Sequence, residues 1–295
     1  MLNRLQAWKT AARPHTLPAA MAPVVAAAGL ADADEVFRLG SFVLALVAAI
    51  AIQIAANFAN DVSDATRGAD TPERIGPPRM VAAGVITPGE MWIATWVAVG
   101  VAVVAAIGLL LVAGPVVIVI GVASVLAMLG YVGGPFPYGY RGLGEVFVFI
   151  FFGLVATVGA RYVHDGSAPL SAWLAAIPIG FLAAAILVAN NLRDIDTDAG
   201  AGKRTLAVII GPERTRILYG ILVVSAFALV GVFAIADRIP RGAIVAVPFV
   251  MAAIRPIRNV LDGVEGRALV TVLRRTARVH LMFGLAIGIG SAIWH

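Results

Sequence analysis

The stretch Asn57-Phe58-Ala59-Asn60-Asp61-Val62-Ser63-Asp64 decides the fold of this chain, because it places two amides and two carboxylates at the end of a long apolar run. A second stretch, Asn190-Asn191-Leu192-Arg193-Asp194-Ile195-Asp196-Thr197-Asp198, repeats the pattern after another apolar run. Acidic side chains are costly in the spans of a membrane protein and are functional candidates there. The two stretches are therefore the first candidates for a functional site.

The composition is that of a membrane protein. The 295 residues are 60% hydrophobic and 13% charged, with a mean hydropathy of +0.93, whereas soluble domains are about a quarter charged. This length suits eight or nine spans of ~20 residues with short loops. We therefore expect an all-α fold in which residues 1–295 form a single transmembrane domain. The chain has no cysteine, which excludes disulfides and thiol catalysis, and nothing in it suggests a nucleic-acid partner or predicts an oligomeric state.

Hydropathy and turn residues predict an amphipathic entry over residues 1–13, followed by nine spans. The expected spans lie near residues 15–31, 41–60, 91–113, 115–132, 144–161, 171–191, 217–236, 242–254 and 279–294. Polar loops are expected at 65–90 and 192–216, and a strongly basic loop at 255–278. The two Asn/Asp stretches then fall at the ends of two spans that point the same way.

The basic residues predict an orientation. If the N-terminus lies in the cytoplasm, only four of the 22 Lys and Arg residues fall in outside loops, namely Arg38, Arg161, Arg238 and Arg241. Cytoplasmic loops of membrane proteins carry such an excess of positive charge. We therefore expect the N-terminus and both Asn/Asp stretches on the cytoplasmic side.

Each stretch predicts one polar stripe on a helix. Residues three or four apart share a helix face, and both sets have those spacings, namely Asn57, Asp61 and Asp64 in the first and Asn191, Asp194 and Asp198 in the second. Asn60 and Asn190 lie at the edges of the stripes. The matching stripes suggest two halves that face one another.

Four facing carboxylates would repel one another unless a cation lay between them. The groups offer only oxygen, and hard oxygen sites suit Mg²⁺, which also bridges to substrate phosphates. The adjoining loops add cations that suit phosphate oxygens, namely Arg67, Arg74, Arg79, Lys203 and Arg204. Together with a dry apolar interior, these groups favour ionisation of an allylic diphosphate.

Other interpretations remain open. The stripes could be solvated helix ends or interhelical pairs, or they could form the ion path of a cation-coupled transporter. Transporter sites usually lie near the midplane of the membrane rather than at one face. The segment Tyr131–Tyr140 could be a plain turn or a site that holds a flat ring.

The motifs resemble those of the UbiA superfamily of intramembrane prenyltransferases. Asn60-Asp61-Val62-Ser63-Asp64 matches its first motif, although Gly68 stands where a further Asp is common. Asp194 and Asp198, followed by Gly202-Lys203-Arg204-Thr205, match the second. The resemblance covers essentially the whole chain and implies about nine helices around a central cavity.

Three further stretches resemble the branch that acts on 1,4-dihydroxy-2-naphthoate in menaquinone biosynthesis. They are Ala12–Pro18, Arg74–Arg79 and Tyr131–Glu145, and Gly68 followed by Asp70 is also typical of that branch. The implied reaction, in a bacterial inner (plasma) membrane, transfers a polyprenyl group from polyprenyl diphosphate to the naphthoate. CO₂ and diphosphate leave, giving demethylmenaquinone. Acceptors such as 4-hydroxybenzoate, homogentisate, haem or chlorophyllide remain alternatives.

The resemblance also implies roles for individual residues. Asp61, Asp64, Asp194 and Asp198 are expected to bind Mg²⁺ and act in catalysis, supported by Asn57, Asn60 and Asn191. Arg67, Arg79 and Lys203 are expected to hold the diphosphate, while Arg13, His15, Tyr131 and Tyr138 are expected at the acceptor. The lipid tail is expected between the helices, open to the bilayer, and whether Asp70 joins the metal site stays open.

Overall fold

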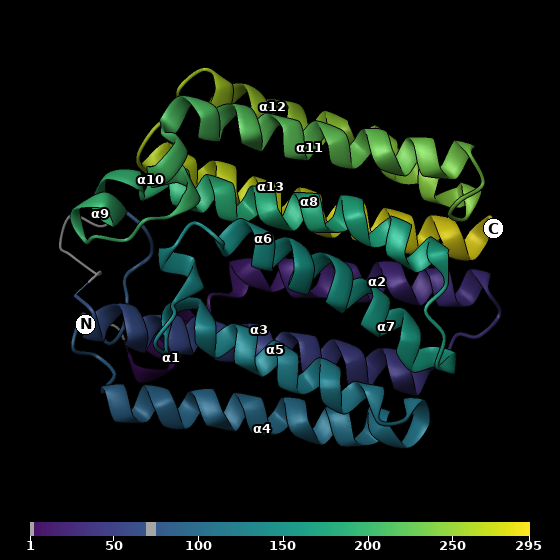
Figure 1. Cartoon of the computed structure of the whole chain (residues 1–295), viewed down its shortest axis with the longest axis horizontal. Helices are drawn as coiled ribbons and strands as arrows, with labels where there is room; N and C mark the ends of the chain where they lie inside the picture. Colours follow the sequence, from purple (N-terminus) through teal and green to yellow (C-terminus); the bar gives the residue numbers. More distant parts are fainter. Residues whose placement is uncertain (1–2, 69–74) are drawn as a thin grey trace.

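The computed structural model describes residues 3–68 and 75–295, and within them it contains helices and no strand. Long helices run back and forth along one axis (Figure 1). They are α1 (Arg4–Ala12), α2 (Leu17–Ala33), α3 (Leu39–Thr66), α4 (Pro88–Ala113), α5 (Val116–Val132), α6 (Gly144–Val148), α7 (Ala156–Asp165), α8 (Leu170–Arg193), α9 (Ile195–Gly200), α10 (Leu206–Ile210), α11 (Pro212–Ile235), α12 (Val250–Leu261) and α13 (Arg267–Ile293). A π-helical turn, η3 (Phe149–Val155), joins α6 to α7, and η4 (Arg241–Phe249) leads into α12.

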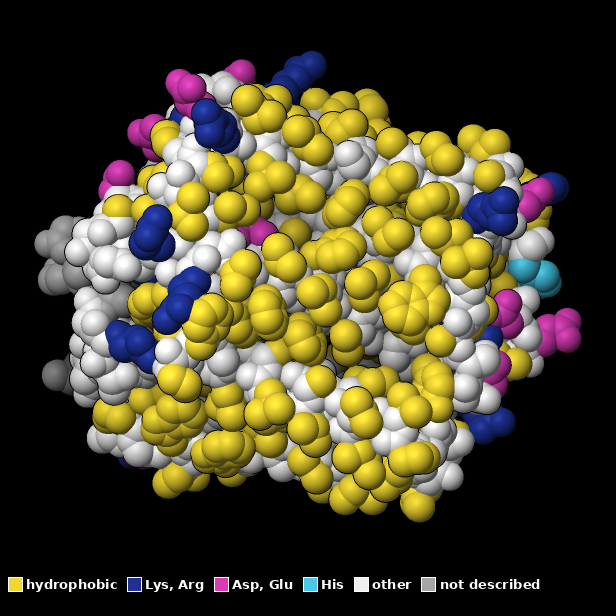
Figure 2. Space-filling view, in the orientation of Figure 1, with side chains coloured by type: hydrophobic (Ala, Val, Ile, Leu, Met, Phe, Trp, Pro, Cys, Tyr) yellow, Lys and Arg dark blue, Asp and Glu magenta, His cyan; other side chains and the backbone are white. Residues whose placement is uncertain are grey.

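The described part of the chain crosses a membrane several times. Eight of its helical segments are long and apolar enough to span a bilayer, and α5 is a shorter apolar helix. These segments correspond to the predicted spans, so the expectation of an all-α, multi-pass fold is confirmed. On the face drawn in Figure 2, hydrophobic side chains cover the middle of the molecule and charged side chains gather toward its two ends, as expected for a surface that faces lipid.

Local sequence explains where the long helices begin and end. Thr87 accepts a hydrogen bond from the Glu90 backbone N–H, and Glu90 accepts one from the Thr87 N–H, which caps α4 with Pro88 in its first turn. The same helix ends at Gly114, whose φ of +77° glycine adopts without strain. Such signals are local, which is why the span order could be predicted.

The expected basic loop at 255–278 is wrong. Helix α12 continues to Leu261 and α13 begins at Arg267, so residues 262–266 alone connect them. Arginine is a good helix former, so a basic segment can be helical. Each of these two helices has an exposed polar face and a buried apolar face: Arg255 and Arg274 are exposed, while Val260 and Val272 are buried. The low average hydropathy of such amphipathic helices led to the prediction of a loop. The predicted loop at 192–216 likewise contains α9, α10 and the start of α11.

The two Asn/Asp stretches lie at the same end of the bundle. Figure 1 places α1, α9 and α10 together at the end opposite the C-terminus. Helix α3 runs to Thr66 and α8 to Arg193 at this same end. The two stretches therefore lie at one end of the helix bundle, as the matching stripes suggested, and we call this part of the molecule the site end.

Candidate active site

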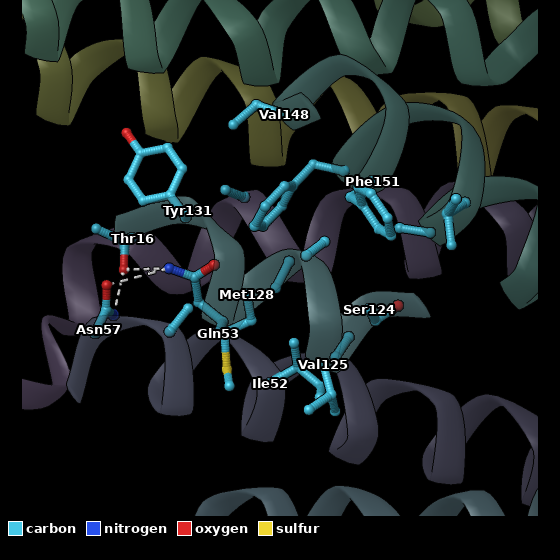
Figure 3. A pocket seen from close by; sticks show the side chains of 18 of the residues that line it. Thr16, Ile52, Gln53, Asn57, Ser124, Val125, Met128, Tyr131, Val148 and Phe151 are labelled. Atoms are coloured by element: carbon cyan, nitrogen blue, oxygen red, sulfur yellow. Dashed lines mark hydrogen bonds between the residues drawn. The ribbon is translucent and has the colours of Figure 1, made fainter. Parts of the chain in front are cut away.

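A cavity of about 830 Å³ lies between α2, α3, α4, α5, α7 and α8. Its walls are mostly apolar, and Figure 3 shows Ile52, Val125, Met128 and Phe151 directed toward it. Polar side chains line it at the site end, where Asp64 and Asp198 approach from two different parts of the chain. The cavity thus joins a charged mouth to a long apolar interior.

On α3 the polar residues that line the cavity are Gln53, Asn57, Asn60 and Asp64. These positions are four, three and four residues apart, which is the spacing of one helix face. Asp61 is not among the residues that line the cavity. The helix face that lines the cavity therefore differs from the predicted stripe at one position: it carries Asn60 instead of Asp61.

Asp61 instead contacts the backbone that follows the polar segment after α3. Its Oδ1 accepts a hydrogen bond from the Val81 N–H at 3.0 Å and its Oδ2 accepts one from the Met80 N–H at 3.2 Å. The side chain is buried, and a carboxylate bound to backbone N–H groups makes strong, charge-assisted hydrogen bonds. Asp61 thereby fixes the position of the neighbouring Arg79.

We expect Asp61→Asn to lower stability rather than to remove a metal ligand. The amide nitrogen cannot accept a hydrogen bond, so one backbone N–H loses its partner, at a cost of about 1–3 kcal/mol. Thermal unfolding of the purified protein measures this loss, with the exposed Asp262→Asn as the matched control. An unchanged unfolding temperature together with lost metal affinity would show that Asp61 binds the metal itself.

Asn57 ties α3 to the corner between α1 and α2. Its amide donates to the Ala12 carbonyl oxygen and to Thr16 Oγ1, both at 2.9 Å, and Gln53 also donates to Thr16 at 3.0 Å (Figure 3). This corner carries Arg13 and His15, which both line the cavity. Asn57 thus supports the predicted acceptor wall, and Gln53 is a cavity residue that the sequence analysis missed.

On α8 and the turn after it, Asn190, Asp194, Thr197 and Asp198 line the cavity. Asn191 does not: it is buried and donates to Glu145 Oε1 at 2.9 Å. The amide that lines the cavity is therefore Asn190, one residue before the predicted Asn191. Both predicted acids do line the cavity: Asp194 lies three residues after Asn191, and Asp198 lies four residues after Asp194, in α9.

Each of the three acids that line the cavity is paired with a cation. Arg79 Nη2 lies 2.5 Å from Asp64 Oδ2, Arg193 Nε lies 2.7 Å from Asp194 Oδ1, and Lys203 Nζ lies 3.3 Å from Asp198 Oδ1. Pairing reduces the cost of burying charge. Arg193, which also donates to Asn190, was counted in the sequence as a loop charge only. The position of Arg193 directly before Asp194 was the sequence signal that could have indicated a role in the site.

Among the remaining predicted residues, Tyr131, Tyr138 and Arg67 lie in the described part of the chain. Tyr131 and Tyr138 line the cavity, and the Tyr138 ring stacks on Phe147 with centroids 3.8 Å apart. Arg67 lies outside the lining and donates to the Gly134 carbonyl oxygen at 3.3 Å. Asp70 and Arg74 lie outside the described residues.

Burial changes the acidity of groups at the site end. It raises the pKa of Asp198 to about 6, and the negative charge of Asp194 adds to this while Lys203 opposes it. Burial also raises the pKa of Tyr140, helped by the charge of Asp64, so its hydroxyl stays protonated and can donate. Near pH 6 a proton therefore competes with any cation for the Asp198 carboxylate.

The oxygen atoms at the mouth fit a hard divalent cation. Asn60 Oδ1 and Asp198 Oδ2 are buried and have no hydrogen-bond partner among the described residues, and buried polar atoms normally have one. Within residues 3–68 and 75–295, no three His, Asp or Glu side chains lie close enough to form a metal site by themselves. Mg²⁺ is commonly held by one or two carboxylates together with substrate phosphates and water.

The fold and the site define a class: a polytopic membrane protein in which acids and cations meet at the mouth of an apolar cavity. The chain belongs to the UbiA prenyltransferase family, whose family model matches residues 20–276. It is 40% identical over 280 residues to the 1,4-dihydroxy-2-naphthoate octaprenyltransferase of Mycobacterium tuberculosis, covering 95% of this chain and 94% of that protein. The Escherichia coli protein of the same name is 34% identical over 298 residues, covering 98% and 96%.

Solved structures show the same fold. A UbiA homologue from Aeropyrum pernix matches with a TM-score of 0.70 and 16% identity over 92% of this chain and 97% of that one. A homologue from Archaeoglobus fulgidus, solved with GPP and Mg²⁺, matches with a TM-score of 0.67 and 17% identity over 95% and 99%. The family match makes this chain an intramembrane prenyltransferase, and the solved structures share its fold.

Proposed function

We propose that this chain transfers a polyprenyl group from polyprenyl diphosphate to 1,4-dihydroxy-2-naphthoate in a Mg²⁺-dependent reaction. The observation that carries the proposal is the meeting of Asn60 and Asp64 with Asp194 and Asp198 at the charged mouth of a long apolar cavity. Relatives at 34–40% identity bear the name of this activity. The carboxylates at the mouth suit a divalent metal ion, and the cations paired with them suit the diphosphate.

Four side chains would hold the metal: Asn60, Asp64, Asp194 and Asp198. When bound, Mg²⁺ neutralises the charge that develops on the leaving diphosphate. Arg79 and Lys203 already lie at the carboxylates, so they can exchange a carboxylate partner for a phosphate oxygen as the diphosphate arrives. Arg67 at the rim adds a third cation. These contacts favour cleavage of the allylic C–O bond because they stabilise the departing group.

The apolar part of the cavity would hold the prenyl chain. Phe147 and Phe151 line it, and their rings are parallel to within 12° with centroids 6.2 Å apart. Aromatic faces stabilise a nearby cation, and the apolar walls exclude water that would otherwise capture the allylic cation. The cavity therefore protects the electrophile until the ring attacks.

The acceptor would lie against the wall formed by Arg13 and His15. The charges of Arg13, Arg274 and Arg193 all act on His15, which makes this wall attractive to a carboxylate. His15 is then placed to accept the phenolic proton as the ring attacks and to return it to the same oxygen when loss of CO₂ restores the aromatic ring. A C–C bond forms between the prenyl group and the ring, and the acceptor carboxylate leaves as CO₂.

We further propose that the site end faces the cytoplasm of a bacterial cell and that the membrane is the plasma membrane. The excess of Lys and Arg at the site end supports this orientation. Labelling of single cysteines introduced at Thr10 and at the exposed Ala168, in the loop between α7 and α8, tests it, because the native chain has no cysteine. Labelling of the Thr10 position from outside the cell contradicts the proposed orientation.

The activity is tested with purified protein, Mg²⁺, a polyprenyl diphosphate and a panel of aromatic acceptors, with products identified by mass. We expect decarboxylated, prenylated product from 1,4-dihydroxy-2-naphthoate, lost with EDTA and restored by added Mg²⁺. Product from 4-hydroxybenzoate but not from the naphthoate contradicts the acceptor and leaves the prenyltransferase assignment intact. Cation transport without any product contradicts the enzyme.

A further inference from the structure

Tyr140 is a residue of the site end to which neither the predicted site nor the proposed function assigns a role. It ends the short helical turn η2 (Tyr138–Tyr140) between α5 and α6. The residue is half-buried and does not line the cavity. It lies behind the charged mouth, where a side chain can act on the groups that do touch substrate.

The hydroxyl of Tyr140 contacts the first acid of the mouth. It donates a hydrogen bond to Asp64 Oδ1 at 3.0 Å, while Arg79 donates to Oδ2 of the same carboxylate. The two partners therefore occupy different oxygens. If Arg79 moves to a phosphate oxygen, Oδ2 becomes available while the hydroxyl still fixes the carboxylate through Oδ1.

The ring of Tyr140 contacts two cations of the opposite wall and the rim. Lys203 Nζ lies 5.3 Å and Arg67 Cζ lies 5.6 Å from the ring centroid, both within the range of cation–π attraction. The backbone joins the same region, because the Tyr140 carbonyl oxygen accepts a hydrogen bond from the Arg204 N–H at 3.1 Å. One residue thus connects the first acid with the cations that follow the second motif.

Tyr138, two residues earlier, is placed differently. Its hydroxyl donates to the Ala127 carbonyl oxygen at 2.6 Å and its ring stacks on Phe147. It belongs to the apolar wall and contacts none of the acids in any described hydrogen bond. The contacts of Tyr140 are therefore particular to its position and are not a general property of this tyrosine-rich turn.

We propose that Tyr140 is a positioning residue with two separable parts. Its hydroxyl orients the Asp64 carboxylate so that Oδ2 faces the metal, and its ring holds Lys203 and Arg67 where the diphosphate arrives. Groups that orient metal ligands in this way typically change metal affinity or activity by about 10–100-fold when removed. The inference rests on the proposed function, because it assigns Asp64 to the metal and Lys203 to the diphosphate.

Two variants separate the parts. Tyr140→Phe keeps the ring, so we expect the Mg²⁺ concentration for half-maximal activity to rise about 10–100-fold, with kcat at saturating Mg²⁺ and KM for polyprenyl diphosphate within a few-fold of wild type. Tyr140→Leu also removes the ring, so KM for the diphosphate substrate rises by a further factor of about two to five for each cation. The affinity for Mn²⁺ in the presence of inorganic diphosphate, followed by electron paramagnetic resonance, reports the metal without turnover.

Tyr219→Phe is the matched control, since Tyr219 is buried and its hydroxyl is bonded to Thr276 at 2.6 Å, in the packing of α11 against α13. We expect wild-type values for both metal readouts in this variant. Wild-type Mg²⁺ and Mn²⁺ affinities in Tyr140→Phe overturn the inference, as does an activity loss that is equal at every Mg²⁺ concentration. Absence of product from the wild-type protein contradicts the proposed function instead. The Mn²⁺ affinity of Tyr140→Phe then still tests whether the Tyr140 hydroxyl supports metal binding, because this measurement needs no turnover.

Discussion

Replacing Asp194 by Asn is expected to reduce prenyl transfer by about 10²–10³-fold or more, a loss typical of removing a group that stabilises transition-state charge. Asp194 lines the cavity mouth and is buried beside Arg193. The amide keeps the size of the side chain but removes the charge that attracts a divalent cation. Initial rates with saturating Mg²⁺ measure the effect, and size-exclusion chromatography and thermal unfolding show whether the protein is folded.

Two further variants make this prediction sharp. Asp196→Asn changes the same chemical group two residues away, but its side chain is exposed, so we expect wild-type activity. Asp198→Asn removes the other acid of this turn without leaving Arg193 unpaired, because Asp198 is paired with Lys203, and we expect a loss as large as that of Asp194→Asn. Wild-type turnover in either cavity variant rules out the metal–diphosphate site.

Replacing Gly29 by Ala is expected to destabilise the whole fold. A Cβ at Gly29 of α2 would lie 1.9 Å from the carbonyl oxygen of Gly288 in α13, and Gly284 and Gly288 meet α2 in the same way. Small residues allow membrane helices to approach with their backbones in contact. Because the obstacle is backbone and cannot rotate away, α2 and α13 must separate, and we expect a cost of about 3 kcal/mol or more.

The control for Gly29→Ala is Gly100→Ala. Gly100 is in α4, is exposed, and has nothing within 4 Å of an added Cβ. In a helix this change is favourable by about 1 kcal/mol when no atom is in the way, so the two variants are expected to change stability in opposite directions. The unfolding temperature in detergent measures both. Equal unfolding temperatures would mean that α2 and α13 do not touch through their backbones.

Much of the fold could be predicted because its signals are local. Apolar runs of sufficient length and the turn at Gly114-Pro115 mark the spans and their ends, although α4 begins at Pro88 rather than at the expected residue 91. The charges of Lys and Arg pair the two Asn/Asp stretches at one end. The motif residues Asp64, Asp194 and Asp198 were also predicted, and all three line the cavity.

The rest depends on contacts between distant segments. Asp61 and Asp64 are equivalent by spacing, yet Asp61 contacts the backbone of Met80 and Val81 while Asp64 faces the cavity. On a helix one residue changes direction by about 100°, so the face that points inward depends on what packs against the others. Tyr140 acquires its position in the same way, from Arg204 and Asp64.

By itself, the sequence determined that this protein is an all-α membrane protein with two acidic stretches at one end and a resemblance to intramembrane prenyltransferases. Hydropathy, helix ends and charge act over a few residues, so they can be recognised without knowing the fold. The tertiary structure alone decided which amides and acids face the cavity, which cation pairs with each acid, and where Arg193, Gln53 and Tyr140 belong. Those features depend on the rotation and approach of whole helices, which the packing of α2, α3, α8 and α13 sets.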